Sequence, residues 1–324
     1  MLKQVGFQRG PLLVVFWLLL GIVWALPDVM AQEPEAAFDW STSEEWLPGV
    51  NYAAFEQQYP NAEGLTCPSY LFFQPQNQRR LKMHALRIDL QTPKLKFVVT
   101  GRAENWGEPM PNFRDEVLSE FVVRTKRQTT RDFAREQRKN GIPVVLAINA
   151  SPWSPFQSGV SHPFADRMGL TISNGEVVCP SDGRPSFIVD KTGAVDLQVV
   201  SADSNTDHIM VAVSGFSFCL TEGQVCEEDT VLHPRTGLGL SRDKRFLIVV
   251  LCDGRQAASH GATVHELGGW LKHFGAHNGL NMDGGGSTTL VRWQDAAQEA
   301  LLVNRPAHGE RANGSNLGVY ILPE

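Results

Sequence analysis

The sequence predicts an α+β fold, in which a mixed or antiparallel β-sheet forms the core of a single domain and a few helices flank it. Short β-branched runs separated by turn sequences recur along most of the chain. Two segments have the composition or the period of a helix. Because these segments do not alternate regularly with the strands, a parallel α/β sheet is not expected.

The composition excludes several classes of protein. A chain of 324 residues with 42% hydrophobic content forms one large or two ordinary domains and is not disordered. Its net charge is −6 and it has no basic stripe, which argues against a nucleic-acid partner. An anionic ligand must therefore be bound by a few individually placed cations.

Residues 1–31 are typical of a secretory signal peptide. Lys3 and Arg9 precede an uncharged apolar run over 11–26, and residues 29–31 offer small side chains to a peptidase. The run is shorter than the roughly 20 residues that a spanning helix needs. We therefore expect cleavage, with an uncleaved membrane anchor as the alternative. The mature protein is expected to be periplasmic or secreted, and the membrane is involved only in export.

Residues 32–80 are predicted to be an irregular N-terminal leader, because Glu, Pro, Trp and Tyr occur there without a sustained period. From 81 to 324 the pattern is that of a folded domain. Apolar residues alternate with charged ones over 86–90, and 95–100 is rich in β-forming residues. Both segments are expected to be strands.

The middle of the chain combines one helix with several hairpins. The polar segment 125–140 ends at Asn140-Gly141, which is typical of a helix C-terminus. Asn174-Gly175 predicts a hairpin turn, and residues 191–193 predict another. Further strands are expected over 142–148, 195–200, 211–213, 238–240 and 246–251.

A second helix is expected between Thr263 and Gly275. Thr263 and Glu266 form a capping-box pattern. The residues that share one apolar face, at spacings of three and four, are Val264, Leu267, Leu271 and Phe274. Strands are expected again at 279–282 and 288–293.

The five cysteines can form disulfides, because the compartment expected for the mature protein is oxidising. Cys219 and Cys226 have a hairpin-like spacing, so a disulfide between them is favoured, and Cys67 and Cys179 are the next candidate pair. Cys252 is expected to be a buried thiol. Because no Cys-x-x-Cys spacing occurs, neither a zinc ribbon nor a thioredoxin-type site is expected.

The string Asp283-Gly284-Gly285-Gly286-Ser287-Thr288 is the most informative one for function. Consecutive glycines permit positive φ and a close approach of a ligand to the backbone. Their amides form a nest for an anion, with the Ser287 and Thr288 hydroxyls as further donors. A tight turn without a ligand is the alternative. The dinucleotide fingerprint, the P-loop and the nucleophile elbow do not fit the string.

Further candidate residues lie near predicted strand ends. Arg235 and Thr236 supply a guanidinium and a hydroxyl that suit a phosphate, with a surface salt bridge as the alternative. Asp253 and Arg255 follow an apolar strand, where a hairpin turn is the alternative. His260 is a candidate for lining a pocket, because it lies in the loop that follows.

Together these strings resemble the phosphodiester glycosidase family, which includes α-N-acetylglucosaminidase-like enzymes acting on N-acetylglucosamine-1-phosphodiesters and bacterial exopolysaccharide-associated members. The matching strings are His-Pro-Arg-Thr-Gly-Leu-Gly (233–239), Val-Val-Leu-Cys-Asp-Gly-Arg (249–255), Gly261-x-Thr-x-x-Glu-Leu267, Leu-Asn-Met-Asp-Gly-Gly-Gly-Ser (280–287), Val303-Asn304-Arg305-Pro306, and Arg311 followed by Asn316-Leu-Gly-Val. A weaker resemblance begins near 140, in a strand that ends at Asn149. There the chain continues with Ala150-Ser-Pro-Trp153 where the family usually has Gly-Gly-Phe-Phe, so one pocket wall differs.

The resemblance implies a hydrolase in which one catalytic domain cleaves the glycosidic C–O bond of a sugar-1-phosphodiester, releases the sugar and leaves a phosphomonoester. Asp283 is the first candidate for the carboxylate that activates water or stabilises an oxocarbenium-like centre, and Glu266 is the second. Asp253 and Asn149 are expected to orient sugar hydroxyls or the water. The groups expected to hold the substrate are Arg235, Thr236, Arg255, His260, the amides of Gly284, Gly285 and Gly286, Ser287, Thr288 and Arg311.

Two other functions stay open. A metal-dependent phosphodiesterase would attack phosphorus, with Asp253 and Asp283 as candidate ligands. A non-catalytic envelope protein would bind a polysaccharide and release no product. No cofactor is expected, and a divalent metal enters only with the first alternative. The expected partner is a phosphorylated glycan or another sugar phosphodiester.

Overall fold

The computed structural model describes residues 37–59, 64–67, 79–110, 121–155 and 162–323, which belong to one folded unit. The predicted signal peptide lies outside the described residues. Within them, no helix is both long enough and apolar enough to cross a lipid bilayer.

The large sheet is built around β17 (Phe246–Cys252), which is buried on both faces. Alternate residues from Leu247 to Leu251 lie in one hydrophobic core, and those from Ile248 to Cys252 lie in another. This double burial explains why the sequence of the strand is apolar throughout. The strand order of the large sheet is β1 (Glu44–Leu47), β2 (Val50–Tyr59), β3 (Arg79–Asp89), β17, β16 (Arg235–Leu240), β18 (Asn278–Asn281), β14 (Ser217–Thr221) and β15 (Gln224–Val225).

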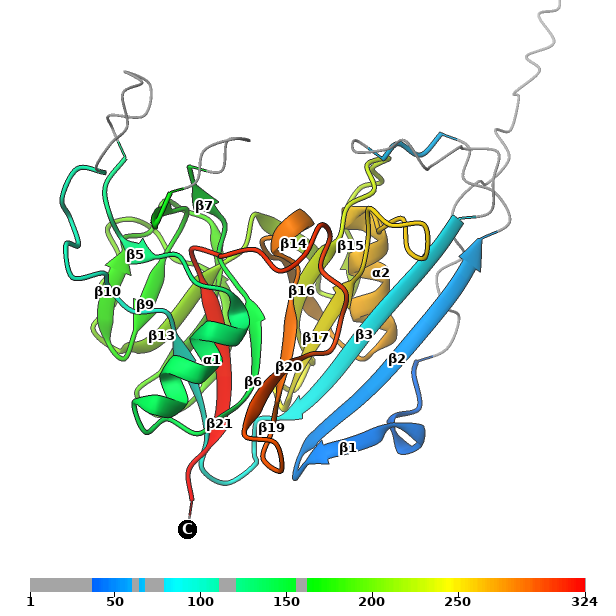
Figure 1. Cartoon of the computed structure of the whole chain (residues 1–324). Helices are drawn as coiled ribbons and strands as arrows, with labels where there is room; N and C mark the ends of the chain where they lie inside the picture. The colour runs from blue at the N-terminus through cyan, green and yellow to red at the C-terminus, as the bar shows by residue number, and fades with distance from the viewer. Residues whose placement is uncertain (1–36, 60–63, 68–78, 111–120, 156–161, 324) are drawn as a thin grey trace, which may run out of the picture. The chain divides into compact units, whose positions relative to one another are not determined.

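Three smaller sheets complete the part of the fold that the structure describes (Figure 1). The C-terminal sheet has the order β20 (Glu299–Leu302), β19 (Leu290–Gln294), β6 (Val144–Asn149), β21 (Asn316–Ile321) and β4 (Leu95–Val99). The middle sheet has the order β10 (Glu176–Cys179), β9 (Thr171–Ser173), β13 (Ile209–Ser214), β11 (Pro185–Asp190) and β12 (Val195–Val199). The small sheet consists of β5 (Thr125–Lys126), β8 (Phe164–Arg167) and β7 (Trp153–Ser154). The strand pairs of these sheets are antiparallel, which confirms the predicted fold class.

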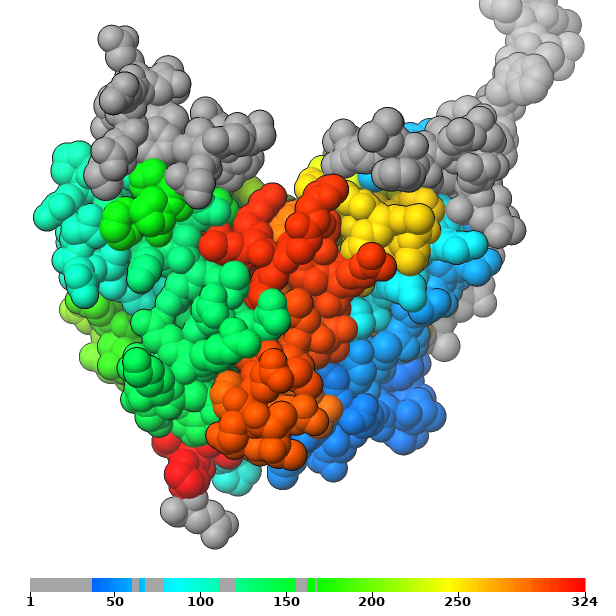
Figure 2. All heavy atoms as spheres, in the orientation of Figure 1, coloured from blue at the N-terminus to red at the C-terminus, as the bar shows by residue number. Residues whose placement is uncertain are grey.

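The main hydrophobic core lies between the three larger sheets. It includes Leu238 of the large sheet, Ile148 of the C-terminal sheet and Phe187 of the middle sheet. The other face of the large sheet packs against α2 (Val264–His273), and the other face of the C-terminal sheet packs against α1 (Thr130–Lys139). Figure 2 shows residues of β19 and β20 at the surface, between those of α1 and those of the N-terminal strands.

Both predicted helices are confirmed, but α1 begins only at Thr130, and Thr125–Lys126 at the start of the predicted segment form strand β5. The Thr263 hydroxyl accepts a hydrogen bond from Glu266 N, and the Glu266 carboxylate accepts one from Thr263 N, which completes the predicted capping box of α2. Helix α1 is followed by Gly141 at a φ of 85°, a conformation that favours glycine. Two short 3-10 helices, η1 (Trp40–Thr42) and η3 (Gly285–Ser287), are also present.

The prediction of an irregular leader does not hold for residues 44–59, which form β1 and β2. Strand β2 pairs with β3 along its whole length, from Val50 opposite Ile88 to Tyr59 opposite Arg79. Most side chains of β2 are half-buried or exposed, so the strand has no sustained apolar period for a sequence pattern to detect. Backbone pairing holds the strand, together with packing of Val50 in one core and of Phe55 and Tyr59 against another.

Cys219 and Cys226 are thiols in the structure, so the predicted disulfide between them is not shown. They nevertheless lie opposite each other across the hairpin of β14 and β15, and Cys226 N donates to Cys219 O over 3.0 Å. Burial raises the pKa of the Cys219 thiol well above its usual range. The bond between the two cysteines stays a prediction, whereas the burial of Cys252 is confirmed.

Gly268 provides a test of how α2 packs on the large sheet. A Cβ atom at this position would lie only 2.2 Å from Cys219 O. Alanine is about 1 kcal/mol better than glycine in a helix interior, so local propensity alone predicts that Gly268→Ala stabilises the protein. We expect a fall in Tm of several degrees instead, because the backbone of β14 must move. Thermal unfolding followed by circular dichroism measures it, and a Tm at or above that of the wild type contradicts this packing.

Candidate active site

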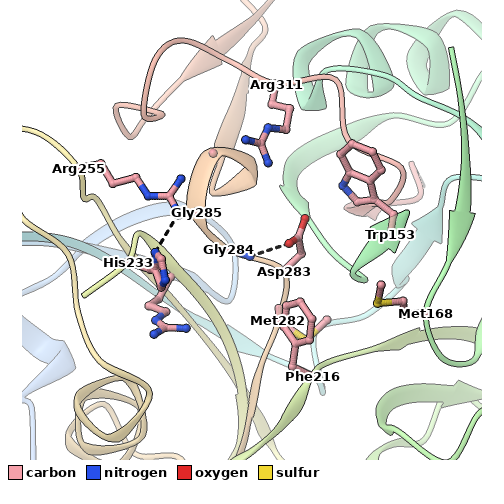
Figure 3. Close-up of a pocket in the computed structure, with 12 residues that line it drawn as sticks. Trp153, Met168, Phe216, His233, Arg255, Met282, Asp283, Gly284, Gly285 and Arg311 are labelled. Atoms are coloured by element: carbon pink, nitrogen blue, oxygen red, sulfur yellow. Dashed lines mark hydrogen bonds between the residues drawn. The ribbon is translucent and has the colours of Figure 1, made fainter. Parts of the chain in front are cut away.

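A cavity of about 590 Å³ lies at the end of the large sheet where β17 and β18 finish and β16 begins (Figure 3). Its lining has a polar part and an apolar part. The polar part consists of His233, Arg235, Arg255, Asp283, Gly284, Gly285, Gly286 and Arg311. The apolar part consists of Trp153, Met168, Phe216 and Met282.

Asn149, the last residue of β6, holds the loop that carries Asp283. Its Nδ2 donates to Asp283 O over 2.6 Å, and its Oδ1 accepts from Thr236 Oγ1 at 2.8 Å and from Thr289 N at 3.1 Å. Asn149, Thr236 and Thr288 are buried and do not line the cavity. The sequence predicted that these three residues contact the substrate, but the structure places them behind the site, where they position it.

Two of the three glycines give the site room for arginine side chains. A Cβ on Gly286 would lie 2.3 Å from Arg311 Nη2, and one on Gly285, whose φ is +61°, would lie 3.0 Å from Arg255 Nη2. The predicted anion nest is mostly absent, because Gly284 N already donates to Asp283 Oδ1 and Gly285 N to Pro234 O. The glycines are therefore required for close packing more than for their own amides.

Asp283 is the carboxylate that faces this cavity. Its side chain is half-buried, and its Oδ1 accepts from Gly284 N over 3.0 Å. Its Oδ2 is buried and has no hydrogen-bond partner among the described residues. Burial raises the pKa of Asp283 to about 6, although the Ser287 hydroxyl and the Arg311 guanidinium act in the opposite direction. A carboxylate of this kind takes up and releases a proton near neutral pH.

Arg255 and Arg311 bring positive charge to the same cavity. Arg255 Nη2 is 2.8 Å from His233 Nδ1, and Arg311 Nη1 is 3.5 Å from the buried Ser287 Oγ. Burial, and to a smaller extent the Arg311 charge, lowers the pKa of neighbouring Arg127. Two guanidinium groups next to one half-buried carboxylate suit a substrate that carries a phosphate.

Arg235 also lines the cavity, but much of its guanidinium is already used. Its Nε donates to Ala262 O and its Nη2 to Val231 O, both over 3.0 Å. The residue that the sequence placed first for phosphate binding therefore also fixes the surrounding loops. Arg255 is better placed to contact a ligand.

The sequence did not identify His233 as a site residue, although it begins one of the strings that resemble the family. Burial first, and then the charges of Arg235 and Arg255, lower the pKa of His233 to about 4. The ring is therefore neutral at physiological pH. Because an arginine can only donate, His233 Nδ1 accepts and the proton lies on Nε2, which makes this residue a donor.

Glu266, the second candidate for the catalytic carboxylate, lies outside the cavity lining. Both of its carboxylate oxygens pair with Arg79, with Arg79 Nη2 2.6 Å from Glu266 Oε2. The Arg79 side chain is buried, and Arg79 Nη2 also donates to Gly261 O. Glu266 therefore joins β3 to the N-terminus of α2 and acts as a structural residue.

Asp253 and His260 also lie away from the cavity that Asp283 faces. The buried Asp253 carboxylate accepts from Asn304 Nδ2 over 2.9 Å and from Arg305 N over 3.2 Å, and it lines a second cavity of about 520 Å³. His260 Nδ1 accepts from Arg80 N over 3.0 Å, which anchors its loop to β3. Both residues hold loops in place. Neither of them lines the cavity that Asp283 faces.

The part of the chain that the structure describes holds no group of three or more His, Cys, Asp and Glu residues arranged for a metal ion. Asp253 and Asp283, the ligands expected for a metal-dependent phosphodiesterase, line separate cavities. The geometry therefore gives this alternative no specific support.

A carboxylate with a raised pKa beside several guanidinium groups is an arrangement that suits acid–base chemistry on an anionic ligand. The chain belongs to the phosphodiester glycosidase family, whose sequence model matches residues 143–320. The resemblance read from the motifs is thus confirmed, including its weaker start near 140.

Solved structures that share this fold include the following two. The catalytic domain of zebrafish N-acetylglucosamine-1-phosphodiester α-N-acetylglucosaminidase, auto-inhibited by its pro-peptide, is 16% identical, with a TM-score of 0.55 over 88% of this chain and 86% of that one. A hypothetical protein from Synechocystis is 13% identical, with a TM-score of 0.53 over 86% of this chain and 63% of that one. A search of curated proteins gives no match.

Replacement of Glu266 separates its structural role from a catalytic one. Glu266→Gln leaves the buried Arg79 charge without its anionic partner, so we expect the free energy of unfolding to fall by about 3 kcal/mol. The turnover of the folded variant should stay within a few-fold of the wild type. Thermal unfolding and steady-state kinetics measure the two effects, and an unchanged Tm with turnover lost would instead assign Glu266 to the chemistry.

The raised pKa of Asp283 predicts a pH-dependent stability. The native state holds the Asp283 proton more tightly than the unfolded state does, so stability is lost as the pH rises from 3.8 to about 6, and the loss is constant at higher pH. We expect Asp283→Asn to raise Tm at pH 8 and to change it little at pH 4. Differential scanning calorimetry at both pH values measures the difference. An equal effect at the two pH values contradicts the raised pKa.

Proposed function

We propose that this protein is an exported hydrolase that cleaves the glycosidic C–O bond of a sugar-1-phosphodiester. The observation that carries the proposal is the position of Asp283, whose Oδ2 has no hydrogen-bond partner among the described residues and which shares one cavity with Arg255 and Arg311. The phosphodiester glycosidase family, to which the chain belongs, supports this class of substrate.

In the proposed reaction, Arg255, Arg311 and His233 Nε2 hold the phosphate oxygens of the diester. As the bond between the anomeric carbon and the phosphate oxygen breaks, negative charge grows on the departing phosphate, and these donors stabilise it. A phosphomonoester leaves readily, so the demand for a general acid is modest. This agrees with a site in which donors outnumber carboxylates.

Asp283 acts on the water in this proposal. The ionised carboxylate accepts a proton as the water oxygen bonds to the anomeric carbon, while the phosphomonoester departs with the electrons of the broken bond. The products are the free sugar and a phosphomonoester on the other alcohol. Because the reactive form of Asp283 is ionised, kcat/KM should rise as the pH increases through about 6.

The substrate is proposed only as a class. The zebrafish enzyme is named for N-acetylglucosamine-1-phosphodiesters, but an identity of 16% shows a shared fold and leaves the sugar open. Export rests on the signal-like pattern of residues 1–31. The expected partner remains a phosphorylated glycan or another sugar phosphodiester outside the cytoplasm, in the periplasm or the medium.

A panel of synthetic sugar-1-phosphodiesters in ¹⁸O-labelled water tests the proposal. We expect one or more members to give a free sugar that carries ¹⁸O and an unlabelled phosphomonoester. Asp283→Asn should lower kcat at least 100-fold, because it removes the base and keeps the shape of the side chain.

Other outcomes identify the two alternatives. Label in the phosphate, with activity lost on chelation, indicates a metal-dependent phosphodiesterase. Binding of glycans without any product from the panel indicates a polysaccharide-binding protein. Near-normal turnover by Asp283→Asn removes Asp283 from the mechanism.

A further inference from the structure

The cavity at Asp283 has two unlike sides, and only one of them suits a phosphate. The cationic side carries Arg255 and Arg311, whereas the opposite side is formed by Phe216, Met168 and Trp153 (Figure 3). Asp283 lies between the two sides in this view. The apolar side offers no charge to a phosphodiester, so it must serve another part of the ligand.

Phe216 differs from the other apolar residues of the cavity in its exposure. Its relative exposure is 46%, whereas Trp153 is buried at 4%. Among the described residues, Phe216 is the aromatic one in the set of exposed large hydrophobic side chains, whose other members are Val199, Leu301 and Leu322. Because Phe216 also lines the cavity, its exposed ring is available for contact with a ligand there.

The backbone that carries Phe216 is fixed in place. Phe216 N donates to Asn281 O over 2.8 Å, and Gly215 N donates to Pro185 O over 2.9 Å. The turn between β13 and β14 runs so close to β18 that a Cβ on Gly215 would lie 2.7 Å from Asn281 O. The ring is therefore presented at the edge of the cavity by a rigid turn, which lowers the entropic cost of binding against it.

We propose that the apolar side of the cavity is the subsite for the sugar ring, and that Phe216 is the surface on which a pyranose stacks. The inference rests on the proposed function and extends it to the orientation of the substrate. The axial C–H groups of a pyranose form an apolar, weakly electropositive face that packs on the electron-rich face of a phenyl ring. The hydroxyl groups at the sugar edge then point away from the ring.

This orientation explains why Asp283 lies where it does. With the pyranose on Phe216 and the phosphate on Arg255 and Arg311, the anomeric carbon falls between the two sides of the cavity, next to the carboxylate. The geometry also predicts a preference. A hexose with equatorial hydroxyls offers an uninterrupted C–H face, whereas an axial hydroxyl on that face must be desolvated against the phenyl ring.

Calorimetric binding of α-D-glucose 1-phosphate and of inorganic phosphate to the full chain tests the subsite without any turnover. We expect Phe216→Ala to weaken the binding of glucose 1-phosphate roughly 2- to 12-fold, the range of a single aromatic contact. Inorganic phosphate should bind Phe216→Ala as it binds the wild type. Phe216→Trp, which keeps an aromatic face, should retain the affinity for glucose 1-phosphate.

Leu301→Ala is the matched control, because Leu301 is another exposed apolar side chain that does not line the cavity. It should leave both affinities unchanged. The subsite is overturned if Phe216→Ala weakens both ligands equally or neither of them, or if the wild type does not bind glucose 1-phosphate. Tm values of the three variants show that each one is folded.

The same measurements keep the subsite and the proposed function apart. Turnover of a sugar-1-phosphodiester without the selective loss in Phe216→Ala overturns the subsite alone. The selective loss without turnover of any diester supports the subsite and overturns the proposed hydrolysis.

Discussion

The geometry of the site depends on one buried carboxamide, that of Asn149. Its amide donates to the backbone of Asp283 while its oxygen accepts from Thr236 and Thr289, so a single side chain connects the C-terminal sheet, the large sheet and the glycine loop. An aspartate could not donate, and an aliphatic residue could do neither, so either one would leave buried polar groups unpaired at about 1–3 kcal/mol each. The Asn149 side chain donates to Asp283 O and accepts from both Thr236 and Thr289 at the same time.

Two carboxylates differ in their surroundings. Glu266, near the N-terminal end of α2, stabilises the fold, whereas Asp283, just after β18, faces the candidate active site. Glu266 is fully paired with Arg79 and strengthens the fold. Asp283 has a buried oxygen without a partner among the described residues, and its pKa is raised to about 6 because burial outweighs the nearby Arg311. The ionised form of Asp283 is unfavourable in the folded protein, and a loss of stability of this kind is common for reactive groups in active sites. In a chain with a net charge of −6, binding of an anion relies on these local cations.

Sequence patterns predicted the fold well where burial imposes a period, and poorly where it does not. Strand β17 and helix α2 were expected because their apolar residues follow the geometry of two cores. Strand β2 was missed because its side chains are mostly half-buried or exposed and divide between two cores, so no sustained apolar period marks it. At the site, Asp283 of the glycine string lines the cavity, but a sequence does not show that the Gly284 amide already donates to the Asp283 carboxylate and the Gly285 amide to a backbone carbonyl. Phe216 was not predicted because its role depends on a turn that meets Asn281 in space.

The double burial of β17 has a consequence for the chain before it folds. Its seven residues contain no charge, proline or glycine, a composition typical of segments that assemble into cross-β aggregates when exposed. In the folded protein β3 and β16 cover its two edges. During folding the protection must come from flanking charges, three basic and one acidic residue at 242–245 on one side and Asp253 with Arg255 on the other. Asp253 and Arg255 thus serve as gatekeepers against aggregation before either of them shapes a cavity.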